Sequence, residues 1–263
     1  MPYRIDLLES SDVVLDQLVE LGALDVEATT HGIAAIMPDA VSTASVAAAI
    51  GARDLRVTPA VGRDDGSVWV VSLRPIRAGR LHVVPADWPA REGTLRMTDS
   101  PAFGTGLHPT TALCLEILDD EIAASRPERA LDVGTGTGVL ALAALGLGVP
   151  HAVAIDLDAE AVRLAAENAR LNDLHARIHL VRGGPEAVSG SWPLVVANLL
   201  AAPLIEMAPT LTRRVGRGGR LILSGIRSSL TTDVSRAYGR LGMRQIDART
   251  RGCWTALTLH ASW

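Results

Sequence analysis

Lysine is absent from this sequence, and all 25 of its basic residues are arginine, a bias that fits genomic base composition better than function. Aromatic residues are scarce, with five Trp, two Tyr and one Phe, so the core must be aliphatic. Only two cysteines occur, Cys114 and Cys253, and no C-x-x-C pair is present. Because both lie in apolar surroundings, we expect both to be buried thiols of a reducing compartment.

Long apolar runs and targeting signals are also missing. The longest apolar run, 139–149, is too short to cross a bilayer, and the first residues lack the basic and apolar regions of a secretion signal. The seven histidines are scattered, and none lies at ligand spacing from another His, a Cys or an acidic cluster. We therefore expect a cytoplasmic protein with no membrane partner and no metal site.

The composition that remains is that of a globular protein. The chain has 263 residues, of which 48% are hydrophobic and 21% charged, which excludes a disordered or fibrous protein. This length allows one large domain, or a principal domain and a small one. The net charge of −4 is unevenly distributed: residues 1–60 carry nine acidic side chains and three arginines, which gives −6, and the remainder gives +2.

The first sixty residues alternate between the periodicities of strands and helices. A helix capped by Ser10 or Ser11 and a second one capped by Ser42 are expected between apolar strands. The order strand, helix, strand, strand, helix, strand is typical of a ferredoxin-like α+β domain, which we expect over residues 1–60. The expected strands cover residues 3–8, 24–30, 33–37 and 55–60.

The rest of the chain divides into a connector and a larger domain. Residues 61–98 are rich in Gly, Pro and Asp and predict a connector with one or two short strands, around Trp69 and residues 81–84. Over 99–263, short apolar runs alternate with helical segments such as 159–171, which predicts a doubly wound, Rossmann-like α/β domain with its ligand at the carboxyl ends of the strands. The apolar runs are 129–133, 152–155, 178–181, 194–197 and 221–223.

The sharpest motif is Asp132-Val133-Gly134-Thr135-Gly136-Thr137-Gly138, which leaves a predicted strand and enters a helix. Glycines allow a tight turn and a close approach of a ligand to the backbone. The dinucleotide fingerprint needs its third glycine one position later, where this chain has Val139. Asp132 suits a ligand with an ammonium group and is a poor neighbour for pyrophosphate. The motif therefore favours S-adenosylmethionine over NAD, with a tight turn that binds no ligand as the alternative.

Two further strand ends carry polar residues. Asp156, about twenty residues beyond the glycine loop, can accept both hydroxyls of a ribose, and Asp158 is expected to cap the following helix. Asn198 ends the apolar run 194–197, where its amide oxygen could accept a hydrogen bond from an incoming amine. The alternative for Asn198 is a residue that only turns the chain.

An upstream loop, A-F-G-T-G-L-H-P-T-T, places two glycines beside the single phenylalanine and leads into an amphipathic helix. This composition predicts a loop that folds over a ligand. Thr110 or Thr111 is expected to cap the helix, and His108 is interpreted as either a loop anchor or a ligand contact.

These segments together resemble the PrmA family, which methylates ribosomal large-subunit protein eleven. The resemblance covers residues 99–260 and rests on F-G-T-G-L-H-P-T-T, D-V-G-T-G-T-G, I-D-L-D, V-A-N-L-L-A-A-P-L and G-G-R-L-I-L-S-G-I, in that order. It implies a class I methyltransferase that uses S-adenosylmethionine, with Asn198 as the catalytic residue and the first domain recognising the substrate. From the motifs and the resemblance together, the residues expected to bind the cofactor are Phe103, Gly104, Thr105, Thr111, Asp132, Gly134, Thr135, Gly136, Gly138, Asp156, Leu157 and Asn198.

The resulting hypothesis is a protein N-methyltransferase acting on the N-terminal α-amine and lysine ε-amines of that ribosomal protein. The alternatives are a related methyltransferase for another protein lysine or a small-molecule amine, and a nicotinamide-dependent oxidoreductase. An acidic first domain favours a basic protein partner and disfavours direct contact with nucleic acid. A cluster of arginines could instead favour contact with nucleic acid: Arg213, Arg214, Arg217 and Arg220. We interpret this cluster as a solvated face, with contact to ribosomal RNA as the alternative.

Overall fold

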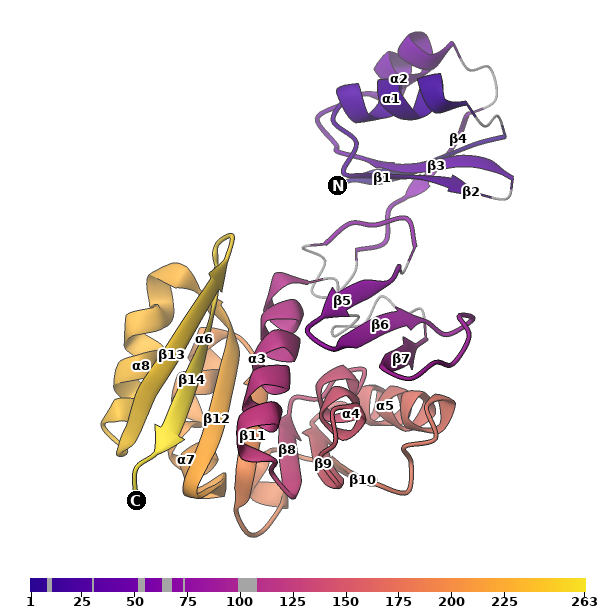
Figure 1. The fold of residues 1–263 in the computed structure, drawn as a ribbon. Helices are drawn as coiled ribbons and strands as arrows, with labels where there is room; N and C mark the ends of the chain where they lie inside the picture. Colours follow the sequence, from indigo (N-terminus) through magenta and orange to yellow (C-terminus); the bar gives the residue numbers. More distant parts are fainter. Residues whose placement is uncertain (9–10, 30, 52–54, 63–67, 73, 99–107) are drawn as a thin grey trace. The chain divides into compact units, whose positions relative to one another are not determined.

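Two compact units make up the chain, Met1–Leu73 and Arg74–Trp263. In the described part of the chain, no helix is long and apolar enough to cross a membrane. The computed structural model describes residues 1–8, 11–29, 31–51, 55–62, 68–72, 74–98 and 108–263 (Figure 1).

The first unit is a four-stranded antiparallel sheet in the order β2-β3-β1-β4, with two helices on one face (Figure 1). This is the ferredoxin-like topology expected from the sequence. β3 lies at the centre, and all six of its residues are buried because apolar groups cover both of its faces. The elements are β1 (Tyr3–Leu7), α1 (Asp12–Glu20), β2 (Asp25–Thr29), β3 (Gly32–Met37), α2 (Thr43–Ile50) and β4 (Leu55–Pro59).

Local signals set the ends of α2. The Ser42 hydroxyl accepts a hydrogen bond from the Ser45 backbone N–H at 3.1 Å, as expected for an N-cap. Gly51 ends the helix with φ = +65°, a conformation that favours glycine. The predicted cap of this helix by Ser42 is therefore confirmed.

A small three-stranded sheet opens the second unit, with β6 between β5 and β7. The predicted strand at residues 81–84 is confirmed as β6, but the structure has two more strands beside it, and Trp69 lies outside all three. The bounds are β5 (Ile76–Ala78), β6 (Leu81–Pro85) and β7 (Thr94–Met97).

The second unit is built around a seven-stranded sheet in the order β10-β9-β8-β11-β12-β14-β13. β10, β9, β8, β11 and β12 are parallel, and β14 runs antiparallel to both β12 and β13. The chain reverses direction across the sheet between β8 and β11, where doubly wound folds bind their ligands. The strands are β8 (Arg129–Val133), β9 (His151–Asp156), β10 (Ile178–Arg182), β11 (Trp192–Asn198), β12 (Val215–Arg227), β13 (Met243–Arg251) and β14 (Trp254–Ala261).

Helices cover both faces of this sheet. α3 packs on α4 and on β11, β12 and β14, while α6, α7 and α8 pack together over β12 (Figure 1). Because side chains alternate along a strand, one set of strand residues joins α6, α7 and α8 in the main core, and the other set faces α3 and α4. The helices are α3 (Pro109–Ser125), α4 (Val139–Gly146), α5 (Ala159–Leu171), α6 (Ala201–Glu206), α7 (Ala208–Arg214) and α8 (Thr231–Gly239).

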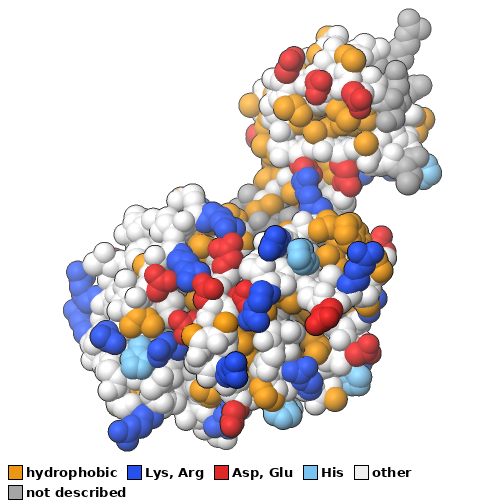
Figure 2. Space-filling view, viewed as in Figure 1, with side chains coloured by type: hydrophobic (Ala, Val, Ile, Leu, Met, Phe, Trp, Pro, Cys, Tyr) orange, Lys and Arg blue, Asp and Glu red, His pale blue; other side chains and the backbone are white. Residues whose placement is uncertain are grey.

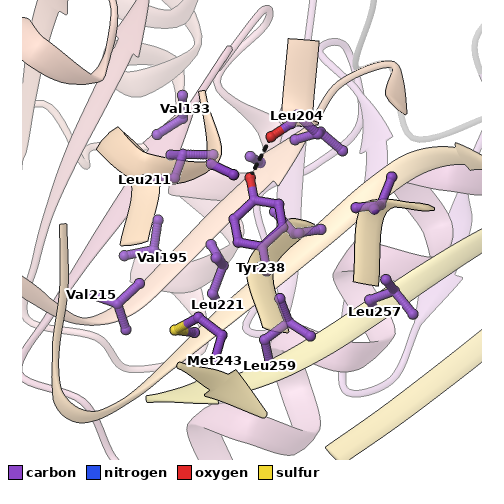
Figure 3. Close-up of a cluster of buried hydrophobic side chains, with 14 of the residues drawn as sticks. Val133, Val195, Leu204, Leu211, Val215, Leu221, Tyr238, Met243, Leu257 and Leu259 are labelled. Carbon is purple, nitrogen blue, oxygen red and sulfur yellow. Dashed lines mark hydrogen bonds between the residues drawn. The ribbon is translucent and has the colours of Figure 1, made fainter. Parts of the chain in front are cut away.

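Tyr238 is a polar anchor within this aliphatic core (Figure 3). Its ring is fully buried, and its hydroxyl donates a 2.8 Å hydrogen bond to the carbonyl of Leu204 on α6. Burial raises the pKa of the Tyr238 phenol, so the group stays protonated and remains a donor. The bond therefore ties α8 to α6 on the core side of the sheet.

Replacing Tyr238 with phenylalanine is expected to lower the free energy of unfolding by about 1–2 kcal/mol, because the Leu204 carbonyl loses a buried partner. Urea denaturation of the variant and the parent protein measures this difference. The ring volume is nearly unchanged, so ligand affinity should not change. An unaltered midpoint would contradict the anchoring role of the hydroxyl.

One expectation about the second unit was wrong, and another was incomplete. Cys114 is buried, but Cys253 is exposed, because it lies in the turn between β13 and β14. The strand predicted at residues 221–223 is confirmed within the parallel sheet, but β12 extends over thirteen residues, and its glycines lie at the register shifts on either side of the predicted segment.

Candidate active site

The carboxyl ends of β8, β9 and β11 meet at one edge of the seven-stranded sheet. In the parallel register Val196 lies opposite Asp132, so Asn198 lies level with Gly134. Val133 lies opposite Ile155, which places Asp156 beside the same loop. The sheet therefore brings together the three strand ends that the sequence singled out.

The glycine loop turns away from β8 with positive φ angles at Gly134, Gly136 and Gly138, of +74°, +54° and +85°. At two of these positions a side chain would also meet close neighbours. A Cβ at Gly134 would lie 2.6 Å from Leu199 Cδ2, and one at Gly138 would lie 3.0 Å from the Ala165 Cβ. The positive φ angles therefore favour glycine at these positions, and close neighbours add to this preference at two of them.

Asp132 is a buried carboxylate behind this loop, with 1% of its surface exposed. Its Oδ2 accepts hydrogen bonds from Thr135 Oγ1 at 2.6 Å and from the Ala141 backbone N–H at 3.1 Å. Its Oδ1 has no hydrogen-bond partner among the described residues. Burial, with a smaller contribution from the charge of Asp156, raises the pKa of Asp132 to about 7.

Asp156 ends β9 and holds the other side of the loop. Its Oδ2 accepts from the Gly136 N–H at 2.9 Å, and its Oδ1 accepts from the Asp158 N–H at 3.0 Å. An ionised carboxylate has about four lone-pair sites, so two remain for ligand hydroxyls. Asp158 caps α5 through the Glu160 N–H, as predicted, and Leu157 between them is exposed.

Asn198 is buried at the tip of β11 and is oriented by α3. Its Nδ2 donates to Thr111 Oγ1 at 3.3 Å, and Thr111 is itself fully buried. Within the described part of the chain, Asn198 Oδ1 accepts no hydrogen bond. A buried acceptor without a partner costs roughly 1–3 kcal/mol, which is a reason to expect a ligand donor there.

Two residues that support the site, one beside Asn198 and one beside His108, were missed by the sequence reasoning. Ser224 lies opposite Asn198 on β12, and its hydroxyl donates to the Thr110 carbonyl at 3.1 Å, which holds α3 against the sheet. Trp254 begins β14 and packs edge-on against His108, with ring centroids 5.1 Å apart. Ser224 is a polar residue within the apolar segment L-I-L-S-G-I, and this contrast could have identified it from the sequence.

The start of α3 differs from the prediction that Thr110 or Thr111 caps it. The N-cap is His108, whose Nδ1 accepts from the Thr110 N–H at 3.3 Å, and Pro109 occupies the first helical position. His108 is buried between this turn and Trp254, so the structure gives it the anchoring role. The candidate residues Phe103, Gly104 and Thr105 lie outside the described residues.

Among the described residues, no group of three or more His, Cys, Asp and Glu side chains is arranged to hold a metal ion. The functional groups that meet at the sheet edge are two carboxylates, one carboxamide and a glycine loop. This combination can bind a cation-bearing nucleoside and orient a neutral nucleophile.

The strand order of the large sheet, with a glycine loop after β8 and an acidic residue at the tip of β9, defines the class I methyltransferase fold. The sequence profile of the family described as Ribosomal protein L11 methyltransferase (PrmA) matches residues 21–262. The chain belongs to this family.

Individual relatives agree with the profile. A ribosomal protein L11 methyltransferase of Geobacter sp. (strain M21) is 41% identical over 194 residues, which cover 70% of this chain and 63% of the relative. One of Chromohalobacter salexigens is 43% identical over 202 residues, covering 74% and 66%. The matches thus span a little under two thirds of these two relatives.

A solved structure supports the fold over the same proportion of the chain. The crystal structure of ribosomal protein L11 methylase from Lactobacillus delbrueckii subsp. bulgaricus has a TM-score of 0.63 and 32% identity to this chain. The similarity covers 71% of this chain and 96% of that one.

Proposed function

We propose that this protein is an S-adenosylmethionine-dependent N-methyltransferase that acts on amines of a ribosomal protein L11. The observation that carries the proposal is the buried Asn198 Oδ1, which accepts no hydrogen bond from the described residues while Thr111 fixes the other end of the amide. A site of this kind can receive an N–H donor beside the glycine loop. The family membership supplies the substrate class.

The residues at the sheet edge fit S-adenosylmethionine better than a dinucleotide. The unpaired Asp132 Oδ1 suits the ammonium of the methionine portion, and Asp156 suits the ribose hydroxyls. A pyrophosphate would instead face two carboxylates, and the Gly136 N–H that could bind it already donates to Asp156. The remaining candidate contacts are Thr111, Thr135, Leu157 and the loop residues 103–105.

When bound, S-adenosylmethionine supplies a methyl group on a positively charged sulfur, which is already an activated donor. The protein therefore has to align the amine and exclude water. Asn198 Oδ1 would accept one N–H of the amine and direct its lone pair towards the methyl carbon. The amine must be neutral: an α-amine has a pKa of about 7.7–8.0 and lysine about 10.4, so lysine must lose its proton during desolvation. The proton released after transfer passes to solvent.

Charge supports a basic protein as the partner. Acidic side chains gather on the surface of the first unit (Figure 2), and α1 carries Asp12, Asp16 and Glu20 at four-residue spacing, all exposed. Such a surface attracts a basic chain and repels nucleic acid. In the arginine cluster near α7, Arg220 pairs with Glu121 at 3.2 Å and Arg214 donates to two backbone carbonyls, so both have partners within the protein.

Mass spectrometry of purified L11 after incubation with the protein and S-adenosylmethionine tests the proposal. We expect L11 to gain one or more methyl groups on its N-terminal amine or on lysines. Labelled cofactor offered with other proteins and with small amines provides the comparison. Transfer to those acceptors without transfer to L11 would refute the substrate, and binding of NAD in place of S-adenosylmethionine in calorimetry would refute the reaction.

A further inference from the structure

Asn168 is a fully buried polar residue on α5, and its side chain contacts two segments that are distant in the sequence. Its Oδ1 accepts from the backbone N–H and from the hydroxyl of Thr98, both at 3.0 Å. Its Nδ2 donates to the backbone carbonyl of Thr137 at 3.0 Å. One amide therefore joins Thr98, the residue after β7, to the glycine loop.

Asn172, one helical turn later, provides a natural comparison. Its Oδ1 accepts from the Arg96 N–H at 2.8 Å, and its Nδ2 donates to the carbonyls of Arg96 at 2.7 Å and Asn168 at 2.8 Å. Four residues of helix rise about 6 Å and two residues of strand about 6.6 Å. Asn168 on α5 and Asn172 at its C-cap therefore match Thr98, just after β7, and Arg96 within β7.

The two asparagines differ in one respect. Each makes three hydrogen bonds and each holds β7 on α5, but only Asn168 also reaches the glycine loop. Thr137 lies between Gly136, whose N–H donates to Asp156, and Gly138, which begins α4. Glycines give the backbone of this loop a wide choice of conformations, so a hydrogen bond from a residue outside the loop has a large influence on its geometry.

We propose that Asn168 is a positioning residue for the cofactor site, and that its bond to the Thr137 carbonyl sets the geometry of the glycine loop. The inference rests on the proposed function and adds to it a residue that lies outside the sheet edge. Its sequence signal is the pair of asparagines four residues apart at the end of α5, A-E-N-A-R-L-N, where a surface helix gives no reason for a buried amide.

The test compares Asn168→Ala with Asn172→Ala, which lose the same number of hydrogen bonds. Both should have a lower Tm. We expect the Kd for S-adenosylmethionine, measured by calorimetry, to rise at least about tenfold in Asn168→Ala and to stay within about twofold in Asn172→Ala. In the ligand-free proteins, amide hydrogen exchange at Gly136 and Gly138 should be faster in Asn168→Ala alone. Equal changes in the two variants would overturn the inference.

If Asn168→Ala does not fold, Asn168→Asp tests whether the hydrogen bond to Thr137 positions the glycine loop. This variant keeps both acceptor contacts to Thr98 and loses only the N–H towards Thr137. At low pH a protonated acid can donate to the Thr137 carbonyl, so the ratio of its Kd to that of the parent protein should fall as the pH is lowered. A ratio that is independent of pH would overturn the inference. If the parent protein itself does not bind S-adenosylmethionine, the proposed function fails, and the hydrogen-exchange comparison still tests Asn168.

Discussion

Replacing Asn198 with alanine is expected to lower kcat by at least about a hundredfold while the Kd for S-adenosylmethionine changes by less than about threefold. The reason is the location of the unpaired Oδ1. It is buried at the strand tip, and Thr111 occupies the Nδ2 end of the same amide, so the free oxygen is available to the amine. Without it, the amine has no fixed acceptor and its lone pair is not aligned with the methyl group.

Single-turnover methylation of L11 and calorimetric titration measure the two quantities separately. Tyr238→Phe is the matched control, because it lowers stability on the opposite face of the sheet and should leave kcat unchanged. Thr111→Val, which removes the partner of Nδ2, should cause a smaller loss of kcat than Asn198→Ala. If kcat and the affinity for S-adenosylmethionine fall equally in Asn198→Ala, Asn198 mainly supports cofactor binding, and its proposed role in orienting the amine is wrong.

The parts of the fold that follow from short-range patterns were predictable. β8 and α5 begin and end where the sequence pattern places them, because a buried parallel strand is mostly apolar and Asp158 caps the helix. The last hairpin was not predicted. β13 is an edge strand whose residues beyond Met243 are exposed or half-buried, so it has no apolar pattern to distinguish it from a surface loop.

The site was predictable where a single segment contains the signal, as in the glycine loop, Asp156 and Asn198. It was not predictable where two distant segments meet. His108 caps α3 because Trp254, almost 150 residues later, packs against its ring, and no local pattern shows this contact. Asn168 is a second example, since its bonds to Thr98 and Thr137 span 70 and 31 residues.

Affinity for S-adenosylmethionine is expected to depend on pH through Asp132. The pKa of this buried carboxyl is about 7 in the ligand-free protein, with burial as the main cause. A bound ammonium favours the ionised form, so binding must release the proton when Asp132 is protonated. Below pH 7 the Kd should therefore rise by up to about tenfold per pH unit, and above about pH 8 it should rise again, because the α-ammonium of the ligand loses its proton there.

Calorimetry between pH 5.5 and 8.5, repeated in buffers of different ionisation enthalpy, measures both the Kd and the released proton. 5′-Methylthioadenosine is the matched ligand, because it keeps the nucleoside and lacks the ammonium. Its Kd should vary little over the same range. A pH-independent Kd for S-adenosylmethionine would contradict the assignment of Asp132 to the ammonium.

Asp132→Asn separates the binding role of this carboxylate from a structural one. A folded-state pKa above the unfolded value of 3.8 means that ionising Asp132 destabilises the fold, and stability is lost as the pH rises towards and through 7. An asparagine stays neutral, and its Oδ1 can still accept from Thr135 and Ala141. At pH 8 the variant should therefore be at least as stable as the parent protein, yet bind S-adenosylmethionine about 10–100-fold more weakly, because a charged hydrogen bond is lost. Weaker binding together with a lower Tm would instead indicate that Asp132 mainly supports the loop.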